Sequence, residues 1–108
     1  MKIIVTGAGG FLAQNLIKEL SKNKEFLIRG YLKKKVKTYK KSNIKYSIKK
    51  IESIKKKDLK GFDAVFNFAS TGAKNFYKNK NFFEDFEKTY HTNVIHSLNL
   101  FNNAIAIG

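Results

Sequence analysis

The hydrophobic residues of the chain follow two patterns, short continuous runs and longer stretches with apolar residues three or four positions apart. The continuous runs, rich in β-branched and aromatic residues, predict buried strands at residues 2–6, 25–32, 43–48 and 62–70. The spaced pattern predicts helices from Gly10 to about Asn23, within 51–61, and from about Asn81 onward. Because strands and helices alternate, we expect a parallel sheet with helices on its faces.

Two further segments complete this outline. Residues 33–41 are rich in lysine and predict an exposed connection. The long C-terminal helix carries an apolar stripe, which we expect to be the face packed on the sheet. The stripe consists of Phe82, Phe86, Tyr90, Val94, Leu98, Phe101 and Ile105.

A glycine-rich stretch, "VTGAGGFLAQNLI" (residues 5–17), joins the first strand to the first helix. Its spacing is T-G-x-x-G-x-x-[GA], in which Gly7 permits a sharp turn out of the strand. Gly10 has no side chain to hold a pyrophosphate away, and Ala13 lets helix and strand pack closely. We expect free N–H groups from about Gly10 through Phe11 to Leu12 to face the phosphates of a dinucleotide. A plain strand–turn–helix is the alternative interpretation.

Three stretches, in this order, resemble the extended short-chain dehydrogenases, the family of nucleotide-sugar epimerases and dehydratases. "TGAGGFLAQNL" is similar to the family's TGxxGFxG turn, and "FDAVFNFAS" to its D-x-V-[FI]-[HN]-x-A-[AS] fourth strand. "NVIHSLNLFNNA" is similar to its N-V-x-G-T-x-N-[LV]-L-x-A helix, with His96 in place of Gly and Ser97 in place of Thr. The resemblance implies an α/β fold, a Rossmann-type parallel sheet with helices on both faces. It covers nearly the whole chain but only the N-terminal half of such a fold, with about four strands.

The resemblance also implies roles for residues beyond the glycine turn. Ala69 and Ser70 would end the fourth strand beside the cofactor, and Thr71 would begin the loop after it. Asn93 would lie on the cofactor side or position a water molecule. A polar strand end is the alternative interpretation of Ser70 and Thr71, since turn-forming residues are common there.

The region after the second strand bears on which nicotinamide cofactor is bound. An acid usually follows that strand in sites that prefer NAD, whereas "IRGYLKKK" contains none. Arg29 and Lys33 would instead meet the 2′-phosphate of NADP, so the sequence favours NADP over NAD, although lysine is abundant throughout. After the third strand, Ile48 retains the aliphatic half of the family's adenine contact, and Ser47 replaces its acid.

Catalytic residues are not predicted within this chain. The family's Tyr-x-x-x-Lys pair lies on a helix after a fifth strand, and its tyrosine exchanges a proton with the substrate hydroxyl. Tyr31 with Lys35 and Tyr46 with Lys50 match the spacing but belong to the second and third strands, so we reject both as catalytic. No metal site is expected either, because His91 and His96, five residues apart, point to different sides of a helix.

Composition adds a strong positive charge. The 108-residue chain has a formal net charge of +14, and all but one of its 22 basic residues are lysine. Such a charge attracts anions generally, but no nucleic-acid recognition motif accompanies it. Without cysteine, a secretion signal or a membrane span, the sequence favours a cytoplasmic protein.

These observations predict one dinucleotide-binding domain over residues 1–108, incomplete at its C-terminus. It would be the cofactor-binding N-terminal portion of an NAD(P)-dependent epimerase, dehydratase or reductase acting on a nucleotide sugar. The unpaired apolar edge of strand 62–70 would favour pairing with a second copy. A non-catalytic dinucleotide-binding module and a basic nucleic-acid-binding protein remain as alternatives.

Overall fold

A four-stranded parallel sheet forms the centre of the computed structural model, which describes residues 1–69 and 90–106. The strand order is β3-β2-β1-β4, and every neighbouring pair is parallel. The strands are β1 (Lys2–Thr6), β2 (Leu27–Leu32), β3 (Ile44–Ile48) and β4 (Ala64–Asn67). The four strands and their parallel pairing confirm the expected fold class.

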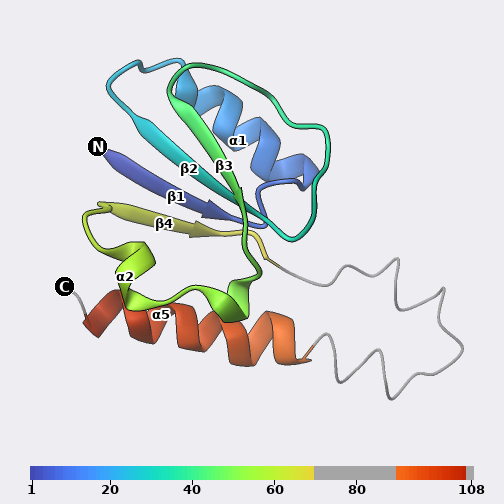
Figure 1. Cartoon of the computed structure of the whole chain (residues 1–108), viewed down its shortest axis with the longest axis vertical. Coiled ribbons are helices and arrows are strands. Elements are labelled where there is room, and N and C mark those ends of the chain that lie inside the picture. Colours follow the sequence, from blue (N-terminus) through green and yellow to red (C-terminus); the bar gives the residue numbers. More distant parts are fainter. Residues whose placement is uncertain (70–89, 107–108) are drawn as a thin grey trace, which may run out of the picture.

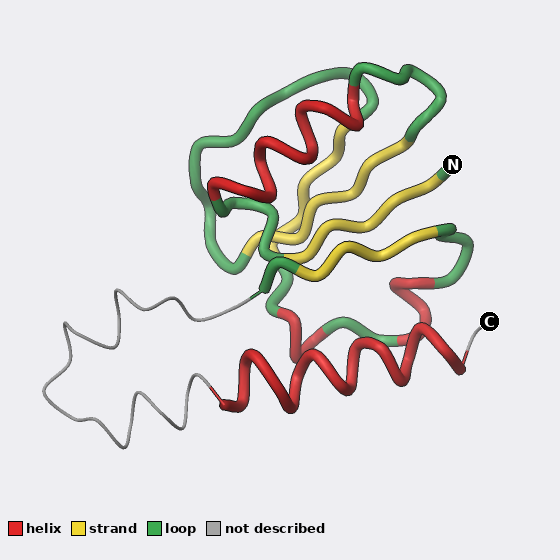
Figure 2. Tube along the Cα trace, turned by 180° about the vertical axis from the view of Figure 1, so that it is seen from behind, coloured by secondary structure: helices red, strands yellow, loops and turns green. Residues whose placement is uncertain are grey.

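Helices cover both faces of this sheet (Figures 1 and 2). Helix α1 (Phe11–Ser21) lies on one face. The opposite face carries the 3₁₀ turn η1 (Ile51–Ser53), the short helix α2 (Lys56–Leu59), and the continuous pair η2 (His91–His96) and α5 (Ser97–Ala106). Each strand of the expected alternation is present: β1 has the expected bounds, β2 and β3 begin two residues and one residue later than expected, and β4 is shorter by two residues at its start and three at its end.

Alternation along the strands produces two hydrophobic clusters, one on each face. On the α1 side the buried side chains include Ile3, Val5, Ala13, Ile17 and Ile28. On the α5 side they include Ile4, Tyr31, Ile54, Leu59 and Leu100. Because both faces are apolar, the strands are buried between two helical layers, as parallel sheets require.

The connection between β2 and β3 contains no helix. Its first part, residues 33–41, is here called the strap. The strap is largely exposed, as its lysine content predicts, and it runs past the start of α1. Asn43 ends the connection, and its Nδ2 donates to the carbonyls of Ser21, Asn23 and Phe26 at 3.0–3.2 Å.

The expected packing of the C-terminal stripe is wrong where the structure describes it. Tyr90, Val94, Leu98, Phe101 and Ile105 are all exposed, Leu98 by 54% and Ile105 by 77%. Ser97 and Leu100 are buried instead, and Ala104 packs beside them. Ser97 accepts a hydrogen bond from Asn67 of β4 at 2.8 Å, so the face of α5 that carries Ser97, Leu100 and Ala104 is the one turned to the sheet. Phe82 and Phe86 lie outside the described residues.

No helix among residues 1–69 and 90–106 is long and apolar enough to cross a membrane.

Candidate functional site

The glycine turn connects the end of β1 to the start of α1, and its first glycine is required by geometry. Gly7 has a φ of +59°, in the left-handed region that favours glycine. A Cβ at Gly7 would lie 2.5 Å from the carbonyl carbon of Phe68, just beyond β4. The turn therefore packs directly against the backbone that leads to Ala69.

Gly10 occupies a different environment at the N-cap of α1. A Cβ there would find only the Gly7 carbonyl oxygen, 3.5 Å away, so this side of the turn is open. The expectation of a free Gly10 N–H is wrong, because that group donates to Gly7 O at 3.2 Å and closes the turn. The N–H groups of Phe11 and Leu12, in the first turn of α1, donate to no backbone oxygen of the described residues. They are available to an anion.

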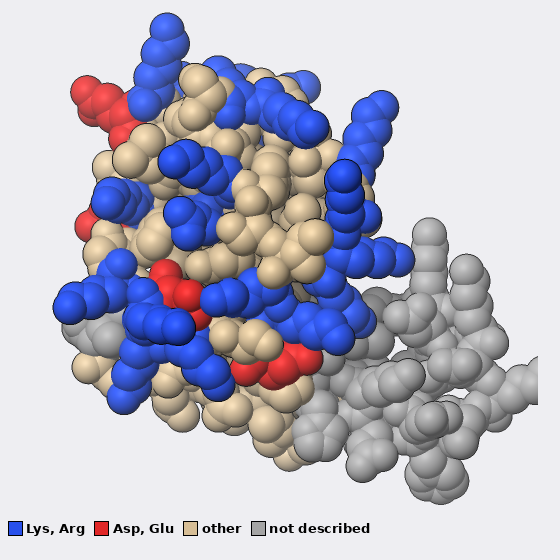
Figure 3. Space-filling model, viewed as in Figure 1, with Lys and Arg blue, Asp and Glu red and all other residues tan. Residues whose placement is uncertain are grey.

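A pocket of about 230 Å³ opens at this turn. The first turn of α1 contains no acidic residue, and Lys33 and Lys34 stand at the pocket's rim, both exposed. Basic side chains are spread across the face of the molecule shown in Figure 3, with few acidic ones. Helix dipole, free N–H groups and lysines thus all favour a negatively charged ligand. The lining residues are Gly7, Gly9, Gly10, Leu32, Lys33, Lys34 and Val36.

The strap forms one wall of this pocket. Val36 sits so close to Gly9 that a Cβ on the glycine would be 2.8 Å from its Cγ2. Further along, the Tyr39 N–H donates to Gln14 Oε1 at 2.6 Å. Gln14 Nε2 in turn donates to Ala8 O at 2.7 Å, within the glycine turn. Gln14 therefore links the turn to the strap.

The sequence analysis missed Gln14, Lys34 and Val36 as parts of the site. Gln14 carries no signal that sets it apart from any polar residue on a helix. Lys34 and Val36 reach the pocket only because the strap folds back over Gly9.

A polar network holds the carboxyl ends of β1 and β4 together. Thr6, almost fully buried, donates from Oγ1 to Asn67 Oδ1, which also accepts the Ala69 N–H at 3.2 Å. Asn67 Nδ2 donates to Ser97 Oγ at 2.8 Å. The network fixes the backbone before Ala69 and docks α5 on the sheet, so η2 lies at the same end of the sheet as the glycine turn (Figure 1).

The sequence model of the NAD-dependent epimerase/dehydratase family matches residues 3–108, almost the whole chain. The chain belongs to this family. No functionally curated protein matches the chain.

Solved structures share the fold. A UDP-glucuronic acid 4-epimerase from Bacillus cereus, in complex with UDP-glucuronic acid and NAD, superposes with a TM-score of 0.77 at 24% identity, over 95% of this chain and 36% of its own. A UDP-glucose 4-epimerase from Thermotoga maritima, with UDP-glucose, gives a TM-score of 0.77 at 20% identity, over 100% and 35%. A short-chain dehydrogenase/reductase superfamily protein from Agrobacterium tumefaciens, with bound NAD, gives 0.76 at 17%, over 100% and 30%. The chain thus spans about a third of the length of these structures.

Of the remaining residues expected at the family's cofactor site, the structure describes some and leaves others outside the described residues. Ile48 ends β3 opposite Leu32 and is 62% exposed, at the same edge of the sheet as the turn. Asn93 lies in η2. Ser70 and Thr71 lie outside the described residues.

Arg29 is not brought to the turn. It lies in the middle of β2, and its guanidinium is 5.8 Å from the centroid of the Phe62 ring. It lines a separate groove with Lys2 at the amino end of the sheet.

The two tyrosines of the rejected Tyr-x-x-x-Lys matches contribute to the packing of the fold. Tyr31 is buried in the core on the α5 side. The Tyr46 hydroxyl donates to Tyr39 O at 2.6 Å and so fixes the strap. Within the part of the chain that the structure describes, no group of His, Asp and Glu side chains could hold a metal ion.

Proposed function

We propose that this chain is the cofactor-binding part of an NAD(P)-dependent epimerase, dehydratase or reductase that acts on a nucleotide sugar. The glycine turn carries the proposal, because a Cβ at Gly10 would fill the open space at the first turn of α1. Family membership supports a nicotinamide cofactor. The structural neighbours solved with NAD, UDP-glucuronic acid or UDP-glucose support the cofactor and the sugar class.

In this proposal the cofactor pyrophosphate lies against Gly10 and accepts hydrogen bonds from the N–H groups of Phe11 and Leu12. Ile48 contacts the adenine. Ala69, Ser70, Thr71 and Asn93 border the nicotinamide side. When bound, the nicotinamide exchanges a hydride with a sugar carbon. The residues of this chain bind and orient the cofactor.

We further propose that the cofactor is NADP. Lys33 follows β2 directly and lines the pocket together with Lys34, and no acidic side chain is among the lining residues. Two cations at this position suit a 2′-phosphate, whereas an acid would suit the ribose hydroxyls of NAD. Arg29 takes no part, because it lies in the groove at the amino end of the sheet.

The test of dinucleotide binding is Gly10→Val, measured by calorimetric titration of the chain with NADPH and NADH. We expect a loss of affinity of about tenfold to a hundredfold, since the side chain would displace the pyrophosphate from charge-assisted hydrogen bonds. Gly61→Asn is the control. A side chain at Gly61 has open space, since nothing lies within 4 Å of its Cβ position, and asparagine tolerates the φ of +85° there. Equal binding by wild type and Gly10→Val would refute the proposal.

The cofactor preference is tested separately with Lys33→Glu and Lys34→Glu. Each change should weaken NADPH binding about fivefold, while the affinity for NADH stays equal or rises. Lys35→Glu, in the strap but outside the pocket lining, is the control for net charge. If NADH binds to wild type as tightly as NADPH does, the preference for NADP is wrong.

Finally, we propose that two copies associate beside β4. This strand ends the described sheet, and the neighbouring η2–α5 helix exposes the stripe of Tyr90, Val94, Leu98, Phe101 and Ile105. Helix α5 contains no charged residue, so two chains of net charge +14 can approach there with least repulsion. Sedimentation should show a dimer that Leu98→Lys converts to monomer, and a monomeric wild type would contradict the idea.

A further inference from the structure

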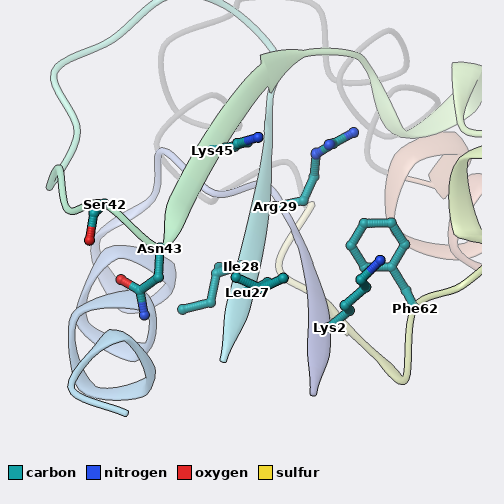
Figure 4. A pocket seen from close by; sticks show the side chains of 8 residues that line it. All are labelled: Lys2, Leu27, Ile28, Arg29, Ser42, Asn43, Lys45 and Phe62. Carbon is teal, nitrogen blue, oxygen red and sulfur yellow. The ribbon is translucent and has the colours of Figure 1, made fainter. Parts of the chain in front are cut away.

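A second basic site lies at the opposite end of the sheet from the glycine turn. A groove of about 200 Å³ crosses the amino-terminal halves of β1, β2 and β3, and its basic lining residues are Lys2, Arg29 and Lys45 (Figure 4). Each of the three comes from a different strand, and Phe62 lies beside Lys2 and Arg29 (Figure 4). Lys2 and Thr6 are the two ends of β1, about 13 Å apart at the rise of a strand, so the groove is separate from the glycine turn.

Strand register is what brings these cations together. Arg29 pairs directly with Lys45 on one side and with Ile4 on the other, and Lys2 precedes Ile4 by two residues. All three basic side chains therefore leave the same face of the sheet. Like charges directly opposite each other on neighbouring strands are unfavourable. The ion pairs of the described residues, Lys22 with Glu19 and Lys49 with Asp58, include none of these three.

Arg29 is held in place before any ligand arrives. Its guanidinium lies over the Phe62 ring at 5.8 Å, a cation–π distance, and the residue is half-buried. A guanidinium with restricted motion presents its donors in a fixed fork, the geometry that suits a phosphate oxygen pair. Lys2 on β1 and Lys45 on β3 each add one positive charge, on opposite sides of Arg29.

We propose that this groove binds a polyphosphate group, carried by an inorganic chain or by a nucleotide. The phosphates bridge Arg29 and Lys45 and relieve the repulsion between them, while Lys2 neutralises the end nearest Phe62. This site goes beyond the proposed function and does not depend on it, since none of its residues lines the glycine pocket.

The experiment is calorimetric titration of the full chain with tripolyphosphate and with ATP at low ionic strength, in a Gly10→Val background. That background removes phosphate binding at the glycine turn, so failure of the dinucleotide proposal does not affect the result. We expect one binding event, weakened at least about tenfold by R29Q/K45Q through the loss of two charge-assisted contacts. The pair K35Q/K37Q removes the same charge from the strap, and we expect it to change the affinity less than about twofold.

The two probes distinguish the sources of the phosphate. Tighter binding of ATP assigns the groove to a nucleotide, and tighter or equal binding of tripolyphosphate assigns it to the phosphate chain itself. The unliganded R29Q/K45Q variant should melt no lower than its parent, because it removes a like-charge pair. Absence of binding, or an equal loss in R29Q/K45Q and K35Q/K37Q, overturns the proposal.

Discussion

The two proposed anion sites lie at opposite ends of the sheet and are built differently. At the carboxyl end, the glycine turn offers backbone N–H groups of α1, and a network through Thr6, Asn67 and Ser97 fixes the strands around it. At the amino end, the basic residues that line the groove are Lys2, Arg29 and Lys45, whose side chains share one face of the sheet. A backbone site depends on the shape of a turn, whereas a side-chain site depends on strand register.

This difference predicts different consequences of substitution. At the carboxyl end, changes to the residues that hold the turn against β4, Gly7 and Asn67, should lower the stability of the fold, because these residues pack and hydrogen-bond the backbone of the proposed site. Changes at the amino end should alter ligand affinity and leave stability nearly untouched.

The largest effect is expected from Gly7→Ala. The Cβ of the alanine would lie 2.5 Å from the Phe68 carbonyl carbon, and the alanine would have to adopt a φ of +59°. We therefore expect the free energy of unfolding, measured with urea, to fall by about 3 kcal/mol or more. Gly10→Ala is the matched control, since its nearest neighbour is 3.5 Å away, and it should stay folded. If both variants lose the same stability, the turn is not held by β4.

A smaller effect is expected from Asn67→Ala. The change removes the acceptor of the Thr6 hydroxyl and of the Ala69 N–H, together with the hydrogen bond that Asn67 donates to Ser97 Oγ, at a cost of about 2 kcal/mol. Ser97→Ala removes a single hydrogen bond of this network and should cost about 1 kcal/mol. Urea unfolding of both variants beside R29Q/K45Q measures the comparison directly. A destabilisation of R29Q/K45Q as large as that of Asn67→Ala would contradict the expectation that the amino-end cations contribute little to stability.

The smallest effect concerns pH. Lys49 follows β3 and pairs with Asp58 at 2.8 Å, and the Lys55 N–H donates to the same carboxylate. Burial acts to raise the pKa of Asp58, but the two hydrogen bonds together with the positive charges of Lys49 and Lys57 outweigh it and hold the pKa below its ordinary value. A lowered pKa means that the pair stabilises the fold above the ordinary carboxyl pKa and that this contribution is lost as pH falls through the lowered one.

The measurement is the urea midpoint of wild type and Asp58→Asn from pH 6 to pH 3. The gap between the two should be constant near neutrality and close in acid. The hydrogen bond to Asp58 raises the pKa of Lys49. At the alkaline end the pair therefore weakens as the pH rises through that raised value. A gap that does not narrow between pH 6 and pH 3 would show that the carboxylate contributes nothing through its charge.

Much of the fold follows from local sequence. The β-branched run before Gly7 and the helical spacing after Gly10 predict β1, the turn and α1 within a few residues, because turn geometry and burial act over short distances. The apolar stripe of the last helix misleads, because α5 turns Ser97 and Leu100, and not the stripe, toward the sheet.

The chain by itself determined the fold class, the family resemblance and the glycines of the turn, since each depends on residues that are neighbours in sequence. Only the tertiary structure decided that Arg29 lies with Lys2 and Lys45 rather than with Lys33, because strand register, not spacing, sets which side chains meet. It alone also brought Lys34 and Val36 to the turn, through the path of the strap over Gly9, and placed the Tyr39 N–H against Gln14 of α1. Local rules fix backbone shape, and long-range packing fixes which charges share a surface.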